Sequence, residues 1–190
     1  MKNAEKLKNG MNFLRVYRRQ ELEGLSTAID RDLKHLVTSG EVRKLAGGLY
    51  YRPRMNAFGA TPPDDHEVVR AFLKTDDFLL TSDNHFNQLG LGLTQVYNGY
   101  RVYNHKRSGT FSLNGKRFAF RQVPSYPLAL SKEYLLVDLF NNLNRLPDRT
   151  DRVIQNLHSH MDRFNRETLD DFLRQYGRPR AREALRRAYA

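Results

Sequence analysis

The sequence predicts an α+β protein in which a small N-terminal unit of helices and a β-hairpin precedes a mixed α/β region that ends in helices. Three observations lead to this prediction. Apolar residues over 29–37 recur at helical spacing. Short apolar segments flank the glycine turns at Gly47-Gly48 and Asn114-Gly115, as in β-hairpins. From Ser131 onward, helical periodicity dominates.

The N-terminal elements follow one another closely. We expect a short helix over 3–9, a strand over 13–17, a short helix over 19–23, a longer helix over 26–38 and a hairpin over 41–52. In the longer helix, Ile29, Leu33, Leu36 and Val37 form one apolar face. Thr27 and Asp30 fit a capping box at its start. Helix, strand, helix, helix and hairpin is the order of a winged helix-turn-helix domain, which we assign to residues 1–56.

The stretch over 54–63 is rich in small residues and proline, and we interpret it as a linker to a second domain over 64–190. That domain is expected to contain a buried strand near 77–81, a helix over 83–89 and β-hairpins turning at Asn98-Gly99 and Asn114-Gly115. Its helical C-terminal part is expected over 133–143, 152–161, 166–176 and 180–189.

Charge and composition narrow the function classes. The 190 residues carry a net charge of +11, which favours polyanionic partners. Residues 1–55 hold twelve Lys or Arg and six Asp or Glu, so more than half of the excess lies there. With no cysteine, the chain forms no disulfide and no thiolate metal site. No apolar run approaches membrane-spanning length and no signal peptide is evident, so we expect a cytoplasmic protein without membrane contact.

The predicted winged helix concentrates cations where such domains meet DNA. A helix of this length enters the major groove, where arginine pairs with guanine, while cations of the wing and of the preceding helix contact phosphates. The candidate DNA-binding residues are Arg18, Arg19, Ser26, Thr27, Arg31, Lys34, His35, Arg43, Lys44, Arg52 and Arg54. Asp30 argues against this assignment unless it pairs with cytosine or serves as a cap. The alternative is a solvated basic face on a domain that binds protein.

Other motifs give no catalytic or metal site. His158 and His160 are two residues apart on a predicted helix, so they point in different directions and do not chelate one ion together. The acidic pairs, such as Asp170-Asp171, are explained by helix caps and solvated faces. We therefore expect no enzyme activity, no metal and no cofactor. The basic C-terminal segment over 174–187 either extends a DNA footprint, meets an acidic partner, or keeps a terminal helix soluble.

Several of these residues resemble a known family. Leu25-Ser26-Thr27, Leu33, Leu36, Gly40, Val42, Arg43, Leu45 and residues 48–53 are similar to the N-terminal winged helix of AbiEi-family antitoxins. Residues 78–82 and 87–91 are similar in pattern to the start of that family's second domain, although Asn87-Gln88-Leu89 stands where the family commonly has a small residue and a histidine.

The resemblance implies a phage-defence context in which the protein represses its own operon by binding inverted repeats in double-stranded DNA as a monomer or homodimer. It also implies that the protein antagonises a co-encoded nucleotidyltransferase-like toxin, as in a type IV toxin–antitoxin pair. The leading hypothesis is thus a sequence-specific DNA-binding transcriptional regulator that acts as an antitoxin. Two alternatives stay open: a protein-interaction module that neutralises a partner through residues 64–190, and a nuclease whose acids and histidines assemble in space.

Overall fold

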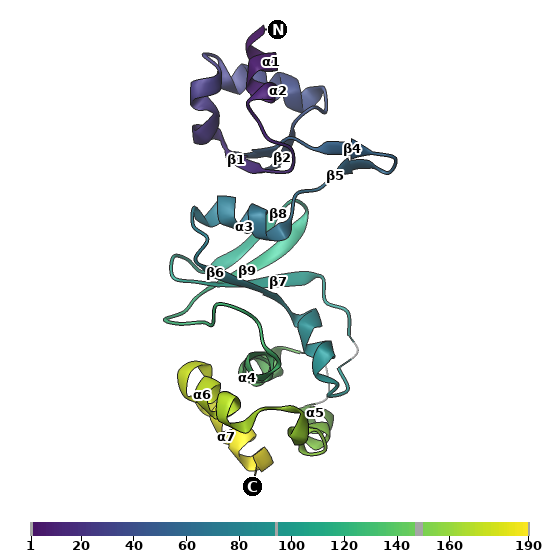
Figure 1. The fold of residues 1–190 in the computed structure, drawn as a ribbon, viewed down its shortest axis with the longest axis vertical. Helices are drawn as coiled ribbons and strands as arrows, with labels where there is room; N and C mark the ends of the chain where they lie inside the picture. Colours follow the sequence, from purple (N-terminus) through teal and green to yellow (C-terminus); the bar gives the residue numbers. More distant parts are fainter. Residues whose placement is uncertain (1, 94, 147–149, 190) are drawn as a thin grey trace. The chain divides into compact units, whose positions relative to one another are not determined.

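The computed structural model describes residues 2–93, 95–146 and 150–189. The chain is of mixed α+β class, as predicted, and divides into two compact units (Figure 1). The first unit comprises Met1–Asp76 and Phe111–Lys116, and the second comprises Asp77–Thr110 and Arg117–Ala190. The boundary therefore lies at Asp76, whereas the sequence suggested a linker near residue 60.

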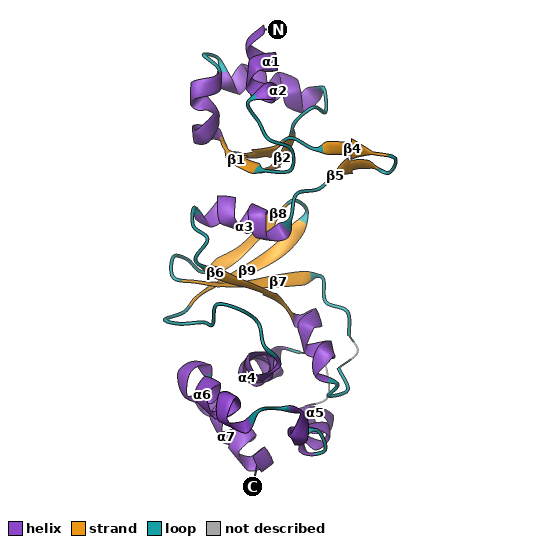
Figure 2. Cartoon of the chain, viewed as in Figure 1, coloured by secondary structure: helices purple, strands orange, loops and turns teal. Residues whose placement is uncertain are grey.

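The first unit alternates helices and short strands (Figure 2). Its elements are α1 (Lys2–Asn9), β1 (Val16–Arg18), η1 (Arg19–Leu25), α2 (Ile29–Thr38), β2 (Arg43–Ala46), β3 (Leu49–Tyr51), β4 (Arg54–Asn56), β5 (Gly59–Thr61) and α3 (Asp65–Leu73), where η marks a 3₁₀ helix. Strands β1, β3 and β2 form an antiparallel sheet in that order. The predicted hairpin around Gly47-Gly48 is confirmed as β2 and β3, and the predicted strand over 13–17 begins later, at Val16.

The core of the first unit forms where the apolar face of α2 meets α1 and η1. Its buried members are Ala4, Leu7, Met11, Tyr17, Leu22, Ile29, Leu33, Leu36 and Val42. These residues place α2 with its apolar side inward, as its periodicity predicted, and so decide which side chains face solvent. The capping box of Thr27 and Asp30 was wrong, because Ala28 occupies the N-cap position without a side-chain hydrogen bond.

Residues 54–61, interpreted as a linker, form the hairpin β4–β5. The Asn56 side chain accepts a hydrogen bond from the Phe58 backbone N–H at 2.8 Å, and Gly59 adopts a φ of 107°, which together close the turn. Helix α3 was missed altogether. Asp64 caps it, and Glu67 on α3 accepts a hydrogen bond from the Val16 backbone N–H of β1 at 3.1 Å, so α3 belongs to the first unit.

The second unit contains a four-stranded sheet and a set of helices (Figure 2). Its elements are β6 (Phe78–Ser82), η2 (Asp83–Leu89), β7 (Gly99–Asn104), β8 (Gly109–Leu113), β9 (Lys116–Gln122), α4 (Lys132–Asn142), η3 (Leu143–Arg145), α5 (Thr150–His158), η4 (Met161–Arg163), α6 (Arg166–Tyr176) and α7 (Pro179–Tyr189). The hairpin tip over 111–116 groups with the first unit. The strand order is β6-β7-β9-β8, with β7 antiparallel to β6 and parallel to β9.

The predicted hairpin at Asn98-Gly99 was wrong, whereas the turn at Asn114-Gly115 is confirmed. Asn114 and Gly115 have φ angles of 52° and 72° and join β8 to β9. Residues 95–98 form no strand, because the Asn84 side chain binds both the N–H and the carbonyl of Tyr97. Helix α4 is buried along nearly its whole length, in an apolar cluster that also contains residues of α5, α6 and α7. No helix in the described ranges is long and apolar enough to cross a bilayer.

Candidate nucleic-acid interface

The outward side of α2 carries a short row of basic side chains. Arg31, Lys34 and His35 are exposed, as is Thr27 just before the helix. Their spacing of three and four residues places the three basic groups on one helix face. Arg31 leaves 76% of its side chain exposed, and its Nε lies 3.6 Å from the neighbouring Asp32 carboxylate. Within the described residues, the side chains of Lys34 and His35 make no hydrogen bond or ion pair, so their polar atoms are available to a ligand.

Three further candidate residues are exposed on strands of the first unit. Arg43 and Lys44 lie on β2, next to the Gly47-Gly48 turn, and Arg54 begins β4. The Arg54 guanidinium lies 5.8 Å from the centre of the Phe13 ring, a cation–π contact that leaves the group exposed. Arg43 pairs in register with Tyr51, whose pKa burial raises. These arginines and lysine therefore add positive charge to the surface of the same unit.

The carboxylate that argued against DNA binding is neutralised. Arg19 donates from Nε and Nη2 to the two carboxylate oxygens of Asp30 at 2.6 and 2.7 Å, and it also pairs with Glu23. Hydrogen bonding to Arg19 holds the pKa of Asp30 below its ordinary value. Asp30 therefore forms a bidentate ion pair with the Arg19 guanidinium. Because Arg19 makes these bonds, it is not free to bind a phosphate.

Two other candidate arginines are bound within the first unit. Arg18 donates from Nη1 to the carbonyls of Ala71 and Phe72 at 2.8 and 3.1 Å, which satisfies the C-terminal end of α3. Arg52 donates from Nη1 to the carbonyl of Lys8 at 3.1 Å, and its guanidinium lies 4.2 Å from the centre of the Phe13 ring. In both arginines, Nη1, which the sequence analysis assigned to phosphate binding, donates to backbone carbonyls of the first unit.

Ser26, another candidate, shapes the turn before α2. Its hydroxyl accepts a hydrogen bond from the Ala28 backbone N–H at 3.0 Å and donates to the buried Asp32 carboxylate at 2.6 Å. The turn that starts the helix is therefore stabilised by Ser26 and Asp32, and not by the expected pair of Thr27 and Asp30.

The β4–β5 hairpin adds a feature that the sequence interpretation missed. Phe58 is fully exposed at its turn, and Met55 on β4 is 67% exposed. Because residues 54–63 were interpreted as a linker, the sequence did not indicate that an aromatic residue there would project from a folded unit. A hairpin turn makes it a projecting apolar side chain of the first unit.

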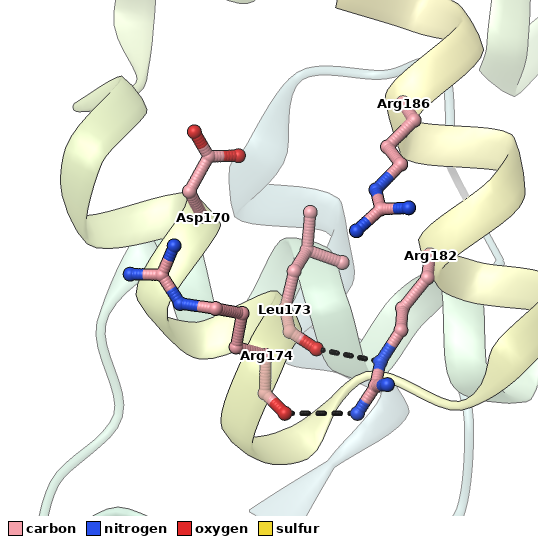
Figure 3. Close-up of a pocket in the computed structure, with 5 residues that line it drawn as sticks. All are labelled: Asp170, Leu173, Arg174, Arg182 and Arg186. Carbon is pink, nitrogen blue, oxygen red and sulfur yellow. Dashed lines mark hydrogen bonds between the residues drawn. The ribbon is translucent and has the colours of Figure 1, made fainter.

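In the basic C-terminal segment, Arg182 of α7 is a structural residue. Its guanidinium donates to the carbonyls of Leu173 and Arg174 at the end of α6, at 3.0 and 2.8 Å (Figure 3). These bonds satisfy carbonyls that the helix leaves unpaired. Arg174 itself pairs with Asp171. Arg174, Arg182 and Arg186 line a hollow of about 250 Å³ together with Asp170 and Leu173.

Three histidines make local contacts. His160 lies 2.7 Å from the Asn156 carbonyl through Nδ1, and the ring nitrogen of His85 lies 3.2 Å from the Thr81 hydroxyl. His105 stacks on Tyr126 at a ring separation of 4.7 Å. Over the described ranges, no group of three or more histidine, aspartate or glutamate side chains is placed to hold a metal ion.

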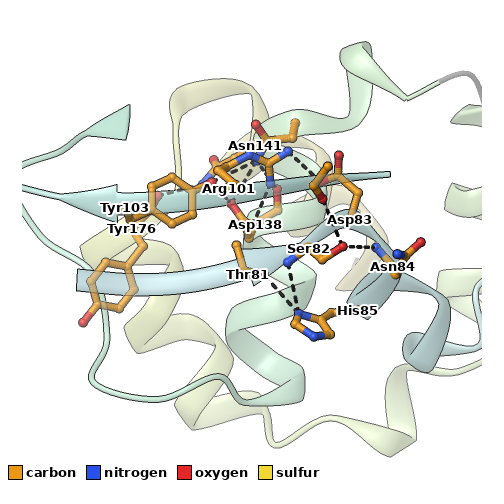
Figure 4. Close-up of polar contacts among 12 residues, drawn as sticks. Thr81, Ser82, Asp83, Asn84, His85, Arg101, Tyr103, Asp138, Asn141 and Tyr176 are labelled. Carbon is orange, nitrogen blue, oxygen red and sulfur yellow. Dashed lines mark hydrogen bonds and ion pairs between the residues drawn. The ribbon is translucent and has the colours of Figure 1, made fainter. Parts of the chain in front are cut away.

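The second unit contains a buried ionic cluster that was not expected from the sequence (Figure 4). Arg101 on β7 donates to Asp83 at 2.6 Å and to Asp138 on α4 at 3.3 Å. Asp138 also accepts from the Tyr103 hydroxyl at 2.5 Å and from the Asn142 amide at 2.9 Å. Burial raises the pKa of Asp138, against the opposing effect of Arg101. The cluster joins the sheet to α4 through fully paired polar groups.

No protein-family model, curated protein or solved structure matches this chain.

Proposed function

We propose that this protein is a sequence-specific DNA-binding regulator whose first unit is a winged helix and whose helix α2 reads the major groove. The observation that carries the proposal is the exposed face of Arg31, Lys34 and His35 on α2. The order of helices and strands in this unit, with its β1-β3-β2 sheet, supports it, since winged helices share that order.

The dimensions of α2 suit this role. Its ten residues extend over about 15 Å, a length that fits across a major groove about 12 Å wide. Arg31 offers a planar fork of donors that matches the two acceptors of guanine, and Lys34 suits guanine or a phosphate. Arg43, Lys44 and Arg54 would contact the backbone and fix the position of the helix.

The occupied arginines refine the proposed interface. Because Arg18 and Arg52 hold backbone carbonyls of their own unit, we assign them to the stability of the first unit. Arg19 serves to cancel Asp30, which leaves the α2 face positive. The proposed interface therefore consists of Thr27, Arg31, Lys34 and His35 on or before α2, with Arg43, Lys44 and Arg54 beside it.

A double variant tests the assignment of α2. A duplex selected from a randomised library is titrated in fluorescence anisotropy with the wild type and with Arg31→Ala/Lys34→Ala, at two salt concentrations. Removal of each base contact should weaken specific binding by about 1–3 kcal/mol and reduce the preference over scrambled DNA.

The matched control is Lys6→Ala/Arg152→Ala, which removes two exposed positive charges from α1 and α5. It should retain the preference for the selected duplex. If the Arg31→Ala/Lys34→Ala variant binds as tightly and selectively as the wild type, α2 is not the recognition helix. If the wild type selects no sequence at all, the protein is not a sequence-specific regulator.

On the resemblance to AbiEi-family antitoxins, we further propose that the chain represses its own operon and antagonises a co-encoded nucleotidyltransferase-like toxin. Expression of the chain from an unrelated promoter should restore growth to cells that produce that toxin. The Arg31→Ala/Lys34→Ala variant should restore growth equally if residues 64–190 act on the toxin directly. Failure of the wild type to restore growth would remove the antitoxin assignment and leave the DNA-binding proposal standing.

A further inference from the structure

One face of the second unit's sheet carries three arginines, Arg101, Arg117 and Arg121. Side chains alternate between the two faces of a strand, so Arg117, Ala119 and Arg121 of β9 share one face. The parallel register aligns Arg101 of β7 with Ala119, and Tyr103 with Arg121. These side chains therefore share the face from which Arg101 reaches Asp138 on α4.

A hollow of about 220 Å³ opens at this cationic face. Its lining consists of Asp83, Gly99, Tyr100, Arg101, Thr110, Arg117, Ala119, Arg121 and Arg145. Of its four arginines, Arg101 is paired with Asp83 and Asp138. Asp83 is the acidic residue in this lining, and within the described ranges Arg117, Arg121 and Arg145 form no ion pair with a carboxylate.

Arg121 shows the cost of this arrangement. Its Nε is buried and, among the described residues, has no hydrogen-bond partner. Burial lowers the pKa of Arg121, and the nearby charges of Arg145 and Arg101 lower it further. Burying an unpaired donor and gathering like charges both cost free energy, and a bound anion would offset both.

We propose that Arg117, Arg121 and Arg145 form a binding site for the phosphate group of a small phosphorylated molecule. Guanidinium forks match phosphate oxygens in pairs, and three of them suit a group with two negative charges. Pockets for drug-sized ligands range over about 300–1,000 Å³, so this smaller hollow fits a phosphate with a small organic part. The site lies in the second unit and is independent of the proposed DNA-binding face.

Calorimetric titration of the full chain tests the site at constant ionic strength, with inorganic phosphate, AMP and a short single-stranded DNA as probes. Saturable binding of AMP is expected, and Arg121→Met and Arg145→Met should each lower the affinity at least tenfold. Inorganic phosphate binding as tightly as AMP would assign recognition to the phosphate alone, whereas tighter binding of AMP would add the nucleoside. Both results support the site.

The control is Arg152→Met, which removes an exposed arginine of α5 that does not line the hollow. It should bind AMP like the wild type. An equal loss in this control, or no saturable binding of phosphate or AMP by the wild type, would overturn the proposal. Saturable binding of single-stranded DNA that Arg121→Met weakens, without binding of AMP, would also overturn the proposal, in favour of a nucleic-acid site.

Thermal unfolding without ligand gives a second and independent readout. If the arginines await an anion, Arg145→Met relieves repulsion, so the apo protein should unfold at the same or a higher temperature while losing the stabilisation that AMP confers. A purely structural arginine would behave oppositely, since its removal would lower the unfolding temperature of the apo protein. Because no duplex enters either assay, their failure would not bear on DNA binding.

Discussion

Replacement of Arg101 by methionine should be among the most damaging single changes in the second unit. Arg101 is 8% exposed and Asp138 is 1% exposed, so the pair is shielded from water. In Arg101→Met, Asp138 keeps two neutral donors, from Tyr103 and Asn142, but loses its cation. Removing one partner of a buried ion pair typically costs about 3–5 kcal/mol.

The converse change, Asp138→Leu, should cost somewhat less. Arg101 would still be paired with Asp83 at 2.6 Å, and the leucine would fill the vacated volume. The Tyr103 hydroxyl would lose its acceptor, and an unsatisfied buried donor costs about 1–3 kcal/mol, whereas the Asn142 amide would keep its hydrogen bond to the backbone carbonyl of residue 138.

The double variant Arg101→Met/Asp138→Leu is the decisive one. It removes the uncompensated charge of the buried Asp138, whereas the more exposed Asp83 loses Arg101 in both variants, so the double variant should be more stable than Arg101→Met alone. Urea unfolding followed by far-ultraviolet circular dichroism measures all three variants, and tyrosine provides the near-ultraviolet signal because the chain has no tryptophan. If the double variant loses the full sum of the two single changes, the two residues do not interact and the cluster has been misinterpreted.

Three further predictions concern the two units separately. Arg52→Ala should lower the unfolding free energy by about 1–2 kcal/mol, because its hydrogen bond to the Lys8 carbonyl of α1 is lost. The DNA affinity of the folded protein should stay within about twofold of the wild type. A loss of DNA affinity without a loss of stability would place Arg52 in the DNA interface. The hydrogen bond from Arg70 holds the pKa of Glu67 below its ordinary value of 4.5, so its stabilisation is present above that pH and is lost as the pH falls through the lower folded value. Glu67→Gln should therefore be about 1–2 kcal/mol less stable at pH 7, and the difference in urea unfolding should disappear once the pH falls below the lowered folded pKa of Glu67. A pH-independent difference would contradict this. Gly177→Ala should lower the unfolding free energy by about 1–3 kcal/mol, because its Cβ would lie 2.6 Å from the Leu173 backbone carbonyl of α6. The control Gly24→Ala has open space around its Cβ and should change thermal stability little. Equal effects of the two changes would refute the steric argument.

Local signals accounted for most of the elements. The helix over 166–176 was predicted with its observed ends, and in the structure Asn165 caps it and Gly177 follows it. The Asn114-Gly115 hairpin was also predicted, since the turn requires two residues at positive φ and the sequence supplies them at adjacent positions. The same dipeptide signal failed at Asn98-Gly99, where a side chain far along the chain, Asn84, holds the preceding backbone.

The candidate interface was predictable in part. Exposure of Arg31, Lys34 and His35 follows from the periodicity of α2, since the apolar positions face the core and leave the others to solvent. The engagement of Arg18 with the carbonyls of α3 was not predictable, because its acceptors lie more than fifty residues away. Sequence pattern identifies which side chains are cationic and outward, but it does not say which of them already have partners.

The sequence by itself determined the α+β class, the helical faces and the concentration of positive charge in the first 55 residues, because these depend on composition and on spacings of a few residues. Tertiary structure decided that α3 joins the first unit, that Asp30 is neutralised by Arg19, and that Arg117, Arg121 and Arg145 meet around one hollow. The physical reason is the same in each case. Pairing of charges and convergence of side chains depend on distances in space between residues that are separated along the chain, and strand register and helix packing set those distances.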